Sequence, residues 1–306
     1  MRNSFVKAAG EIFESNDKTV LLLGDIGAFL LKDIKEKYPN RFYNMGAAEA
    51  AMMSVAVGMA LDGWIPFVYT ITPFVTSRCF DQIRVGAGYH NANVKIVGVG
   101  SGVSYGSLGS THHSIEDLAL MRSVPNMTVL SPSDGPETAK ATKAAAEHVG
   151  PVYLRLGLKV PDLPREGGVN FKIGRAEVIK STRTVAIIST GDLVRESLGA
   201  AEMLEKEGVN VVVVNVSTIK PLDTTTLGNV LSNSYAAVTV EEHSIYGGLG
   251  SAVSEIVSKM DPVNRPRFEI MGIEDKFLDK YGKRDQVLKY LGLDSVGIYE
   301  KIKELL

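Results

Sequence analysis

The sequence is short of cysteine and of long hydrophobic runs, and both shortages narrow the classes of protein to consider. Cys79 is the only cysteine among 306 residues, which excludes an internal disulfide and a cysteine-based metal cluster. We expect its thiol to fill core space. No window holds 18 uninterrupted apolar residues, and the N-terminus reads as the start of an amphipathic helix. We therefore expect a cytoplasmic protein with no membrane partner.

The sequence also lacks an excess of charge of either sign. Lys and Arg number 33 and Asp and Glu number 35, giving a formal net charge of −2 with the charges scattered along the chain. Without a basic patch we expect no nucleic-acid partner, and a small-molecule substrate or a protein partner instead. The composition, 45% apolar and 22% charged, is that of an ordinary globular protein long enough for two domains.

Two series of short apolar runs alternate with helix-like segments. This alternation predicts an α/β protein with two doubly wound parallel-sheet domains. Residues 159–174 concentrate Pro, Gly and charge without periodicity, which is typical of a linker. We divide the chain into a domain at 1–160, a linker at 161–175 and a smaller domain at 176–306. The expected strands are 19–25, 94–100, 127–134, 151–156, 184–190, 209–216 and 236–243.

Glu49 is the one ionisable group in a helical stretch, Gly46 to Leu61, in which nearly every other residue is Ala, Met, Val or Gly. Such a helix should be packed on most sides, where a carboxylate is costly unless something satisfies it. One interpretation is structural: Glu49 lies in the first helical turn or pairs with an arginine. The other is functional: a buried carboxylate at a cleft does proton chemistry for a ligand.

A second informative stretch is the Gly/Ser-rich segment 101–134, which begins "SGVSYGSLGSTHHS". It follows an expected parallel strand, and open α/β sheets bind ligands at that edge. His112 or His113 taken singly would more often be structural, but this position favours a function for at least one of them. By contrast, "HSIYGGLGSAV" at 243–253 lacks the spacing of a dinucleotide-binding fingerprint, so we interpret it as a tight strand-to-helix turn.

Four motifs, in order, resemble the C-terminal half of the transketolase family of thiamine-diphosphate enzymes. They are "FYNMGAAEAAMMSVAVGMALDGWIPFVYTITPF", "DQIR", "GSTHHSIEDLALMRSVPNMTVLSPSD" and "EEHSIYGGLGSAV", and the similarity spans roughly residues 5 to 300. The resemblance implies a pyrimidine-binding domain followed by the transketolase C-terminal domain. The same pair occurs in 1-deoxyxylulose 5-phosphate synthases and in the beta subunits of 2-oxo acid dehydrogenases.

The resemblance also implies a role for several cofactor-binding residues. Glu49 matches the family carboxylate that hydrogen-bonds the aminopyrimidine of thiamine diphosphate and favours its imino tautomer. Phe74 best matches the phenylalanine that stacks on the pyrimidine, with Tyr69 and Phe80 as further wall residues unless they are ordinary core. Asp25 matches an aspartate near the cofactor and substrate channel, although it could equally cap the next helix.

On the substrate side, His112 matches the family histidine that stabilises charge on the donor oxygen, and His113 takes a supporting place beside it. Leu108 stands where transketolases carry an acidic residue, and Gly100 where they carry a histidine. Leu158 replaces the arginine that grips the sugar phosphate. Arg155 and Lys159 remain as nearby cations for a phosphorylated substrate.

The motifs that bind diphosphate and metal are missing. The family's GDG motif, followed downstream by NN, belongs to an N-terminal domain, and this sequence has no NN at all. The resemblance therefore implies the small subunit of a split-gene transketolase, in an α2β2 assembly with self-dimerisation. A separate N-terminal chain would hold most of the thiamine diphosphate contacts and the Mg²⁺, and we expect no metal ligand in this chain.

The expected activity is transfer of a two-carbon ketol unit between sugars, most simply from a ketose phosphate to an aldose phosphate. Three alternatives stay open at this point: a 1-deoxyxylulose 5-phosphate synthase-like subunit, a 2-oxo acid dehydrogenase beta-like subunit, and a non-catalytic scaffold. The histidine pair after a Gly-rich loop favours sugar chemistry over the decarboxylating alternatives. A retained Glu49 and His112 argue against a scaffold.

Overall fold

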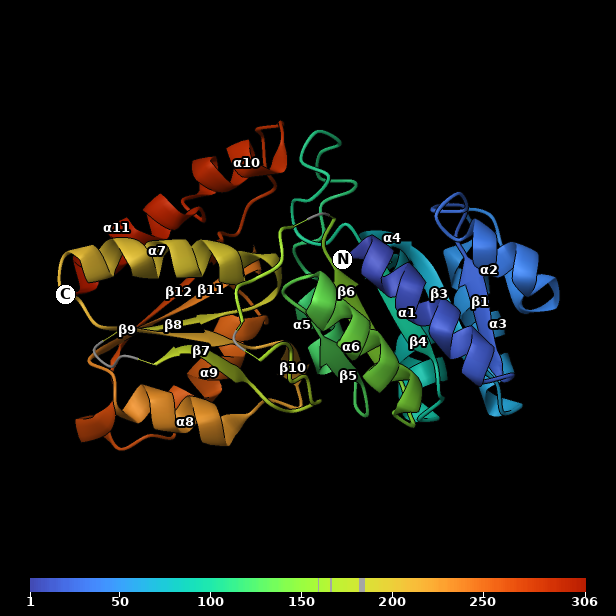
Figure 1. Cartoon of the computed structure of the whole chain (residues 1–306), viewed down its shortest axis with the longest axis horizontal. Coiled ribbons are helices and arrows are strands. Elements are labelled where there is room, and N and C mark those ends of the chain that lie inside the picture. The colour runs from blue at the N-terminus through green and yellow to red at the C-terminus, as the bar shows by residue number, and fades with distance from the viewer. Residues whose placement is uncertain (159, 166, 182–184) are drawn as a thin grey trace.

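The computed structural model describes residues 1–158, 160–165, 167–181 and 185–306 as two α/β domains that lie beside one another (Figure 1). The predicted fold class is confirmed. The strands are β1 Thr19–Leu23, β2 Phe42–Asn44, β3 Ile65–Ile71, β4 Lys95–Val99, β5 Thr128–Leu130, β6 Val152–Leu156, β7 Glu177–Ser181, β8 Val185–Ser189, β9 Val211–Asn215, β10 Thr218–Lys220, β11 Ala236–Ser244 and β12 Arg267–Ile273. The α-helices are α1 Arg2–Ser15, α2 Lys32–Lys37, α3 Glu49–Leu61, α4 Thr72–Val75, α5 Asp117–Ser123, α6 Gly135–Glu147, α7 Val194–Lys206, α8 Thr224–Ser232, α9 Leu249–Val257, α10 Arg284–Leu291 and α11 Ser295–Leu305.

The first sheet has seven strands in the order β10-β5-β6-β4-β3-β1-β2. Six of them are parallel, and β1, β4 and β6 are buried along their whole length. Strands covered on both faces need continuous apolar runs, which explains why these three were visible in the sequence. Helices α1 and α6 pack together on one face, and α3 packs against β3 on the other.

The seventh strand of this sheet comes from the second half of the chain. Strand β10 pairs antiparallel with β5 and carries the chain back onto the first domain before α8 begins. The sequence predicted a second domain with a sheet of its own and no shared strand. The three residues between Ser217 and Pro221 are too few to reveal a strand in the sequence. Because the first sheet includes this strand, the two domains are joined more closely than we expected.

The second sheet has five strands in the order β12-β11-β8-β9-β7. Strands β8, β9 and β11 are parallel, as predicted. Strand β12, which was not predicted, is also parallel, whereas β7 runs antiparallel at the edge. Helices α7 and α11 pack together on one face, and α8 contacts α9 on the other (Figure 1). In the described part of the chain, none of the helices combines the length and the apolar character needed to cross a membrane.

Candidate active site at the edge of the first sheet

Glu49 is the first residue of α3, and its carboxylate is buried at 2% exposure. Arg78, which follows the short helix α4, donates from Nη1 to Glu49 Oε2 at 2.8 Å. Both parts of the structural interpretation therefore hold: the carboxylate lies in the first helical turn and has an arginine partner. Because the Arg78 side chain is half exposed, this ion pair lies at the protein surface and not deep in the core.

Phe74 and His112 form the next part of the site. The Arg78 guanidinium lies 4.3 Å from the centre of the Phe74 ring, a cation–π contact. The Phe74 ring meets the His112 ring edge-on, with centroids 5.3 Å apart, and the Tyr105 ring also meets it edge-on, with centroids 6.1 Å apart. The structure thus brings together Glu49, Phe74 and His112, which come from three separate segments of the sequence.

The His112 ring is oriented by its neighbours. Its Nδ1 lies 3.0 Å from Thr111 Oγ1, and the two flanking rings restrict rotation. In the described part of the chain no hydrogen bond reaches Nε2, so this nitrogen is available to a ligand. A histidine with one ring nitrogen engaged and the other free suits polar contact with a substrate oxygen.

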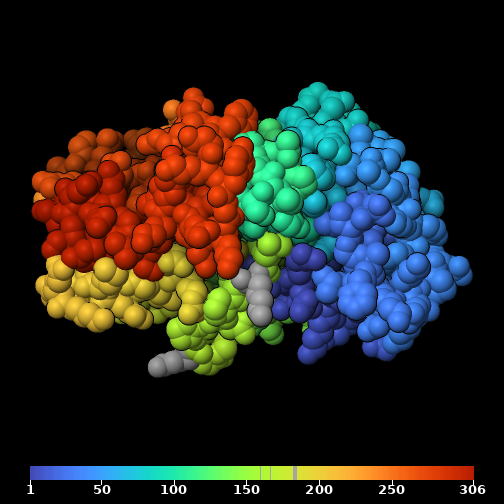
Figure 2. Space-filling view, turned by 90° about the horizontal axis from the view of Figure 1, so that it is seen from above, coloured from blue at the N-terminus to red at the C-terminus, as the bar shows by residue number. Residues whose placement is uncertain are grey.

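Residues 100–114, named here the histidine loop, carry Tyr105, His112 and His113. The loop is closed by two backbone bonds between Gly102 and Ser114, from Gly102 N to Ser114 O at 3.0 Å and from Ser114 N to Gly102 O at 2.8 Å. Gly102 has a φ of +60° and leaves no room for a side chain beside Glu242. From above, the loop lies between the first domain and the segment that leads into α10 (Figure 2).

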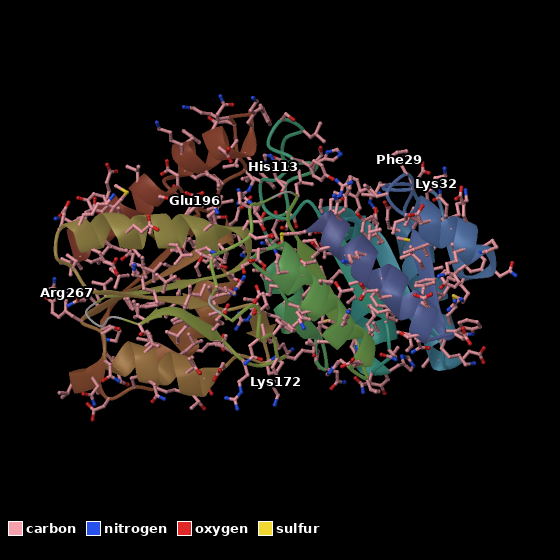
Figure 3. All side chains as sticks on the ribbon, in the orientation of Figure 1. Phe29, Lys32, His113, Lys172, Glu196 and Arg267 are labelled. Atoms are coloured by element: carbon pink, nitrogen blue, oxygen red, sulfur yellow. The ribbon has the colours of Figure 1, made fainter. Side chains whose placement is uncertain are left out.

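His113 points into the protein, unlike His112. Its ring is buried, and burial lowers the pKa of the imidazole below its ordinary value. Its Nε2 is buried without a hydrogen-bond partner among the described residues. Figure 3 shows His113 within the histidine loop, far from Phe29 at the other end of the first domain. This placement matches the supporting role expected of His113 but not a direct substrate contact, which stays a prediction.

Residues of the second domain form hydrogen bonds with the histidine loop and support it, a role that the sequence did not reveal. Glu242, in β11, accepts a bond from Val103 N at 2.7 Å and is paired with Arg284 of α10. Gly282 N also donates to Gly106 O at 3.2 Å. These contacts position the loop, and the absence of catalytic residues from this domain stays a prediction.

Arg155 lies in the same bracing network and is not free to bind a substrate. Its side chain is 3% exposed, and its Nε and Nη2 donate to Asp117 at 2.7 and 3.2 Å. Nη2 also reaches the carbonyl of Glu242 at 2.9 Å. This geometry argues against the predicted phosphate contact, because the guanidinium is buried and already paired. Lys159, the other predicted cation, lies outside the described residues.

The remaining predicted cofactor residues take no part in the contacts that join Glu49, Arg78, Phe74 and His112. Asp25 follows β1 with a φ of +55° and accepts a bond from Asn44 Nδ2 at 2.8 Å, so it caps no helix. Tyr69 is fully buried and stacks on Phe5 at 5.4 Å. Phe80 is half buried against the core. The packing of Tyr69 and Phe80 is ordinary core packing, and their cofactor roles stay predictions.

Two further expectations are confirmed. Cys79 is buried in the core, and burial, reinforced by the charge of Glu49, raises the pKa of its thiol to about 12. The segment after β11 is a tight strand-to-helix turn: the buried carboxylate of Glu241 accepts bonds from Leu249 N and Gly250 N at 2.7 and 2.8 Å. A carboxylate at this position satisfies the first amides of α9, so no nucleotide is needed there.

Comparisons with known proteins assign both domains. Residues 1–159 match the family described as "Transketolase, pyrimidine binding domain", and residues 174–298 match "Transketolase, C-terminal domain". A "Putative transketolase C-terminal section" from Methanocaldococcus jannaschii is 35% identical over 307 residues, covering 99% of this chain and 95% of that protein.

Two other matches bear on assembly. An apulose-4-phosphate transketolase subunit from Actinobacillus succinogenes is 37% identical over 269 residues, covering 87% of this chain and 85% of that protein. A solved structure described as "Split gene transketolase, inactive beta4 tetramer" has a TM-score of 0.89 and 37% identity, covering 100% of this chain and 97% of that one.

Proposed function

The chain belongs to the transketolase family, and on that premise we propose that it is the C-terminal, pyrimidine-binding subunit of a thiamine-diphosphate-dependent transketolase. The reaction is transfer of a two-carbon ketol unit from a ketose phosphate to an aldose phosphate. The observation that carries the proposal is the contact chain Glu49, Arg78, Phe74 and His112 at the edge of the first sheet. It places a carboxylate, an aromatic face and a histidine within one ligand's reach.

The residues present fit an aminopyrimidine. Glu49 Oε2 is taken by Arg78, whereas no donor among the described residues reaches Oε1. Oε1 is therefore the atom at which the chain would hold the ring nitrogen and its proton, and the Phe74 ring supplies a flat apolar surface beside it. When bound, thiamine diphosphate supplies the nucleophilic carbon that accepts and releases the ketol fragment.

His112 would act on the sugar. Its ring contacts those of Phe74 and Tyr105, and its Nε2 can donate to or accept from a substrate oxygen. A preoriented polar group at a position where charge develops stabilises the transition state more than a flexible one does. The hydrogen bond that Glu242 accepts from Val103 N helps to hold the histidine loop in place.

The other half of the site would come from a second polypeptide. We assign the diphosphate and Mg²⁺ contacts to an N-terminal transketolase chain with the GDG and NN motifs, in a cytoplasmic α2β2 assembly. Support comes from the match over most of the chain to a relative named as one subunit of a transketolase, and from the full-length match to a split-gene structure. The name of that relative also supports a phosphorylated sugar as substrate.

The test is Glu49→Gln in the assembled complex. The amide keeps the size of the side chain but cannot hold the proton, and Arg78 is exposed enough to be hydrated when its partner is gone. We expect exchange of the C2 proton of bound thiamine diphosphate, followed by NMR, to slow by about a hundredfold or more. Glu116→Gln, at an exposed carboxylate of the same sheet edge, is the matched control. Wild-type exchange in Glu49→Gln would refute the proposal.

A further inference from the structure

A side chain of the second domain covers the tip of the histidine loop. Ser107, Leu108 and Thr111 at the tip are exposed, whereas Gly109 among them is buried. The ring of Tyr281 lies over this glycine: a Cβ atom built on Gly109 would be 2.5 Å from Cε1 of the tyrosine. Tyr281 therefore packs directly on the backbone of the loop.

Gly109 is the residue to which the backbones of both histidines are bonded. Its carbonyl oxygen accepts hydrogen bonds from His112 N at 2.9 Å and from His113 N at 3.0 Å. Its φ of +77° lies in the left-handed region that favours glycine. A shift of Gly109 would therefore move the backbone of His112, and with it the imidazole whose Nε2 is available to a ligand.

The base of the histidine loop has anchors of its own. Val103 is fully buried in the core of the second domain, and its N–H donates to Glu242 at 2.7 Å. Gly282 N donates to Gly106 O at 3.2 Å. These contacts hold the loop as far as Gly106, so loss of the Tyr281 ring would loosen the tip while the base stays in place.

Tyr281 acts through its ring and on the backbone. The residue is 62% exposed, and among the described residues no hydrogen bond reaches its Oη. The contacts of His112 with Phe74, Tyr105 and Thr111 restrain the imidazole itself. The Tyr281 contact restrains the turn that carries the imidazole, which is a separate requirement for a fixed direction of Nε2.

We propose that Tyr281 is a positioning residue for ketol transfer, whose ring fixes the direction of His112 through Gly109. The inference rests on the proposed function, since it concerns the part of His112 in that reaction. His112 remains the group that contacts the substrate. A polar group held where charge develops stabilises the transition state more than a mobile one does, so loosening the tip lowers kcat.

The kinetic test is a double-mutant cycle in the complex with the N-terminal chain. Tyr281→Ala should lower kcat about tenfold with KM unchanged. His112→Ala should lower kcat further, and adding Tyr281→Ala to it should change kcat by less than about twofold, because the group being positioned is gone. Tyr281→Phe should match the wild type, since it keeps the ring.

Tyr235→Ala is the matched control. Tyr235 belongs to the same domain, is 51% exposed, and packs against Arg267, whose guanidinium lies 4.9 Å from the ring centre. Figure 3 shows Arg267 at the end of the second domain that is remote from His113. This variant also removes a half-exposed tyrosine ring and should leave kcat unchanged.

A second readout needs neither the cofactor nor the partner chain. Amide hydrogen exchange of residues 107–113, measured on this chain alone, should become about tenfold faster in Tyr281→Ala. It should keep the wild-type rate in Tyr281→Phe and in Tyr235→Ala. Exchange in β4 should not change in any of the three variants, because that strand lies in the core of the first domain.

Three results would overturn the inference. They are an unchanged kcat in Tyr281→Ala, an equal fractional loss when the same change is made in His112→Ala, and a raised KM alone, which would indicate direct contact with the substrate. If the wild-type complex transfers no ketol unit, the proposed function has failed and the inference falls with it. Faster exchange at the tip in Tyr281→Ala would then show a loop contact without that reaction.

Discussion

Replacing Asp117 by asparagine should destabilise the first domain, because it removes the charge that balances a buried arginine. Asp117 is fully buried and accepts from Tyr153 Oη at 2.6 Å as well as from two nitrogens of Arg155. Burial is the largest single influence and would raise the pKa of Asp117. The nearby charges of Arg155 and His243, together with the hydrogen bonds from Arg155 and Tyr153, outweigh it and hold the pKa below its usual value. Asp117 is therefore ionised in the folded protein and forms an ion pair with Arg155.

Removing one partner of a buried pair leaves an uncompensated charge, which costs about 3 to 5 kcal/mol. We expect Asp117→Asn to lower the free energy of unfolding by that amount. The assay is urea denaturation followed by the fluorescence of Trp64, the only tryptophan, which reports on the first domain separately from the second.

Two further variants make the reasoning refutable. Asp117→Leu combined with Arg155→Met removes both charges and should recover most of the loss, apart from about 1 to 3 kcal/mol for the unpaired Tyr153 hydroxyl. Glu36→Gln, in the exposed pair with Lys32, should leave the midpoint unchanged. A loss under about 1 kcal/mol in Asp117→Asn, or a double variant no more stable than it, would contradict the reasoning.

Three other predictions concern pH, the histidine loop and the cofactor. Burial, opposed by Arg284, raises the pKa of Asp192 to about 6 from 3.8, so the folded chain binds the extra proton and stability falls as pH rises between these values. Asparagine does not titrate, so the melting temperature of Asp192→Asn minus that of the wild type should increase as pH rises from 3.8 to about 6 and stay level above it. A difference that does not change with pH would contradict this prediction. Gly102→Ala would place a Cβ 2.5 Å from Glu242 at a φ of +60°, and kcat of the complex should fall roughly tenfold or more, whereas Gly228→Ala, with open space around it, should not change it. Phe74→Leu should raise the dissociation constant for thiamine diphosphate about 2- to 10-fold in a titration of the complex, and unchanged affinity would remove Phe74 from the cofactor site.

The sequence revealed the elements whose pattern is continuous and apolar. Strands such as β4 and β9 are buried on both faces and read as unbroken runs, and the Pro- and Gly-rich segment between the domains lacks any period. Strands β7 and β10 were missed for two different reasons. The first is a half-exposed edge strand with polar residues, and the second has only three residues.

The candidate site could be foreseen less completely than the fold. Motifs made Glu49, Phe74 and His112 candidates, and the structure brings these three residues together, whereas their roles stay predictions. Arg78 was missed because its partner lies 29 residues away with no periodic relation between them. The pairing of Val103 with Glu242 joins residues 139 apart in sequence. Contacts of this kind depend on how the two domains dock, and no local pattern encodes them.

The most direct test of the central proposal is reconstitution. The chain, its N-terminal transketolase counterpart, and an equimolar mixture of the two are each assayed for ketol transfer from a ketose phosphate to an aldose phosphate, with thiamine diphosphate and Mg²⁺ present. We predict activity in the mixture and none in either chain alone, because each carries half of the site. Activity of this chain by itself, or an inactive mixture that nevertheless assembles and retains cofactor, would contradict it.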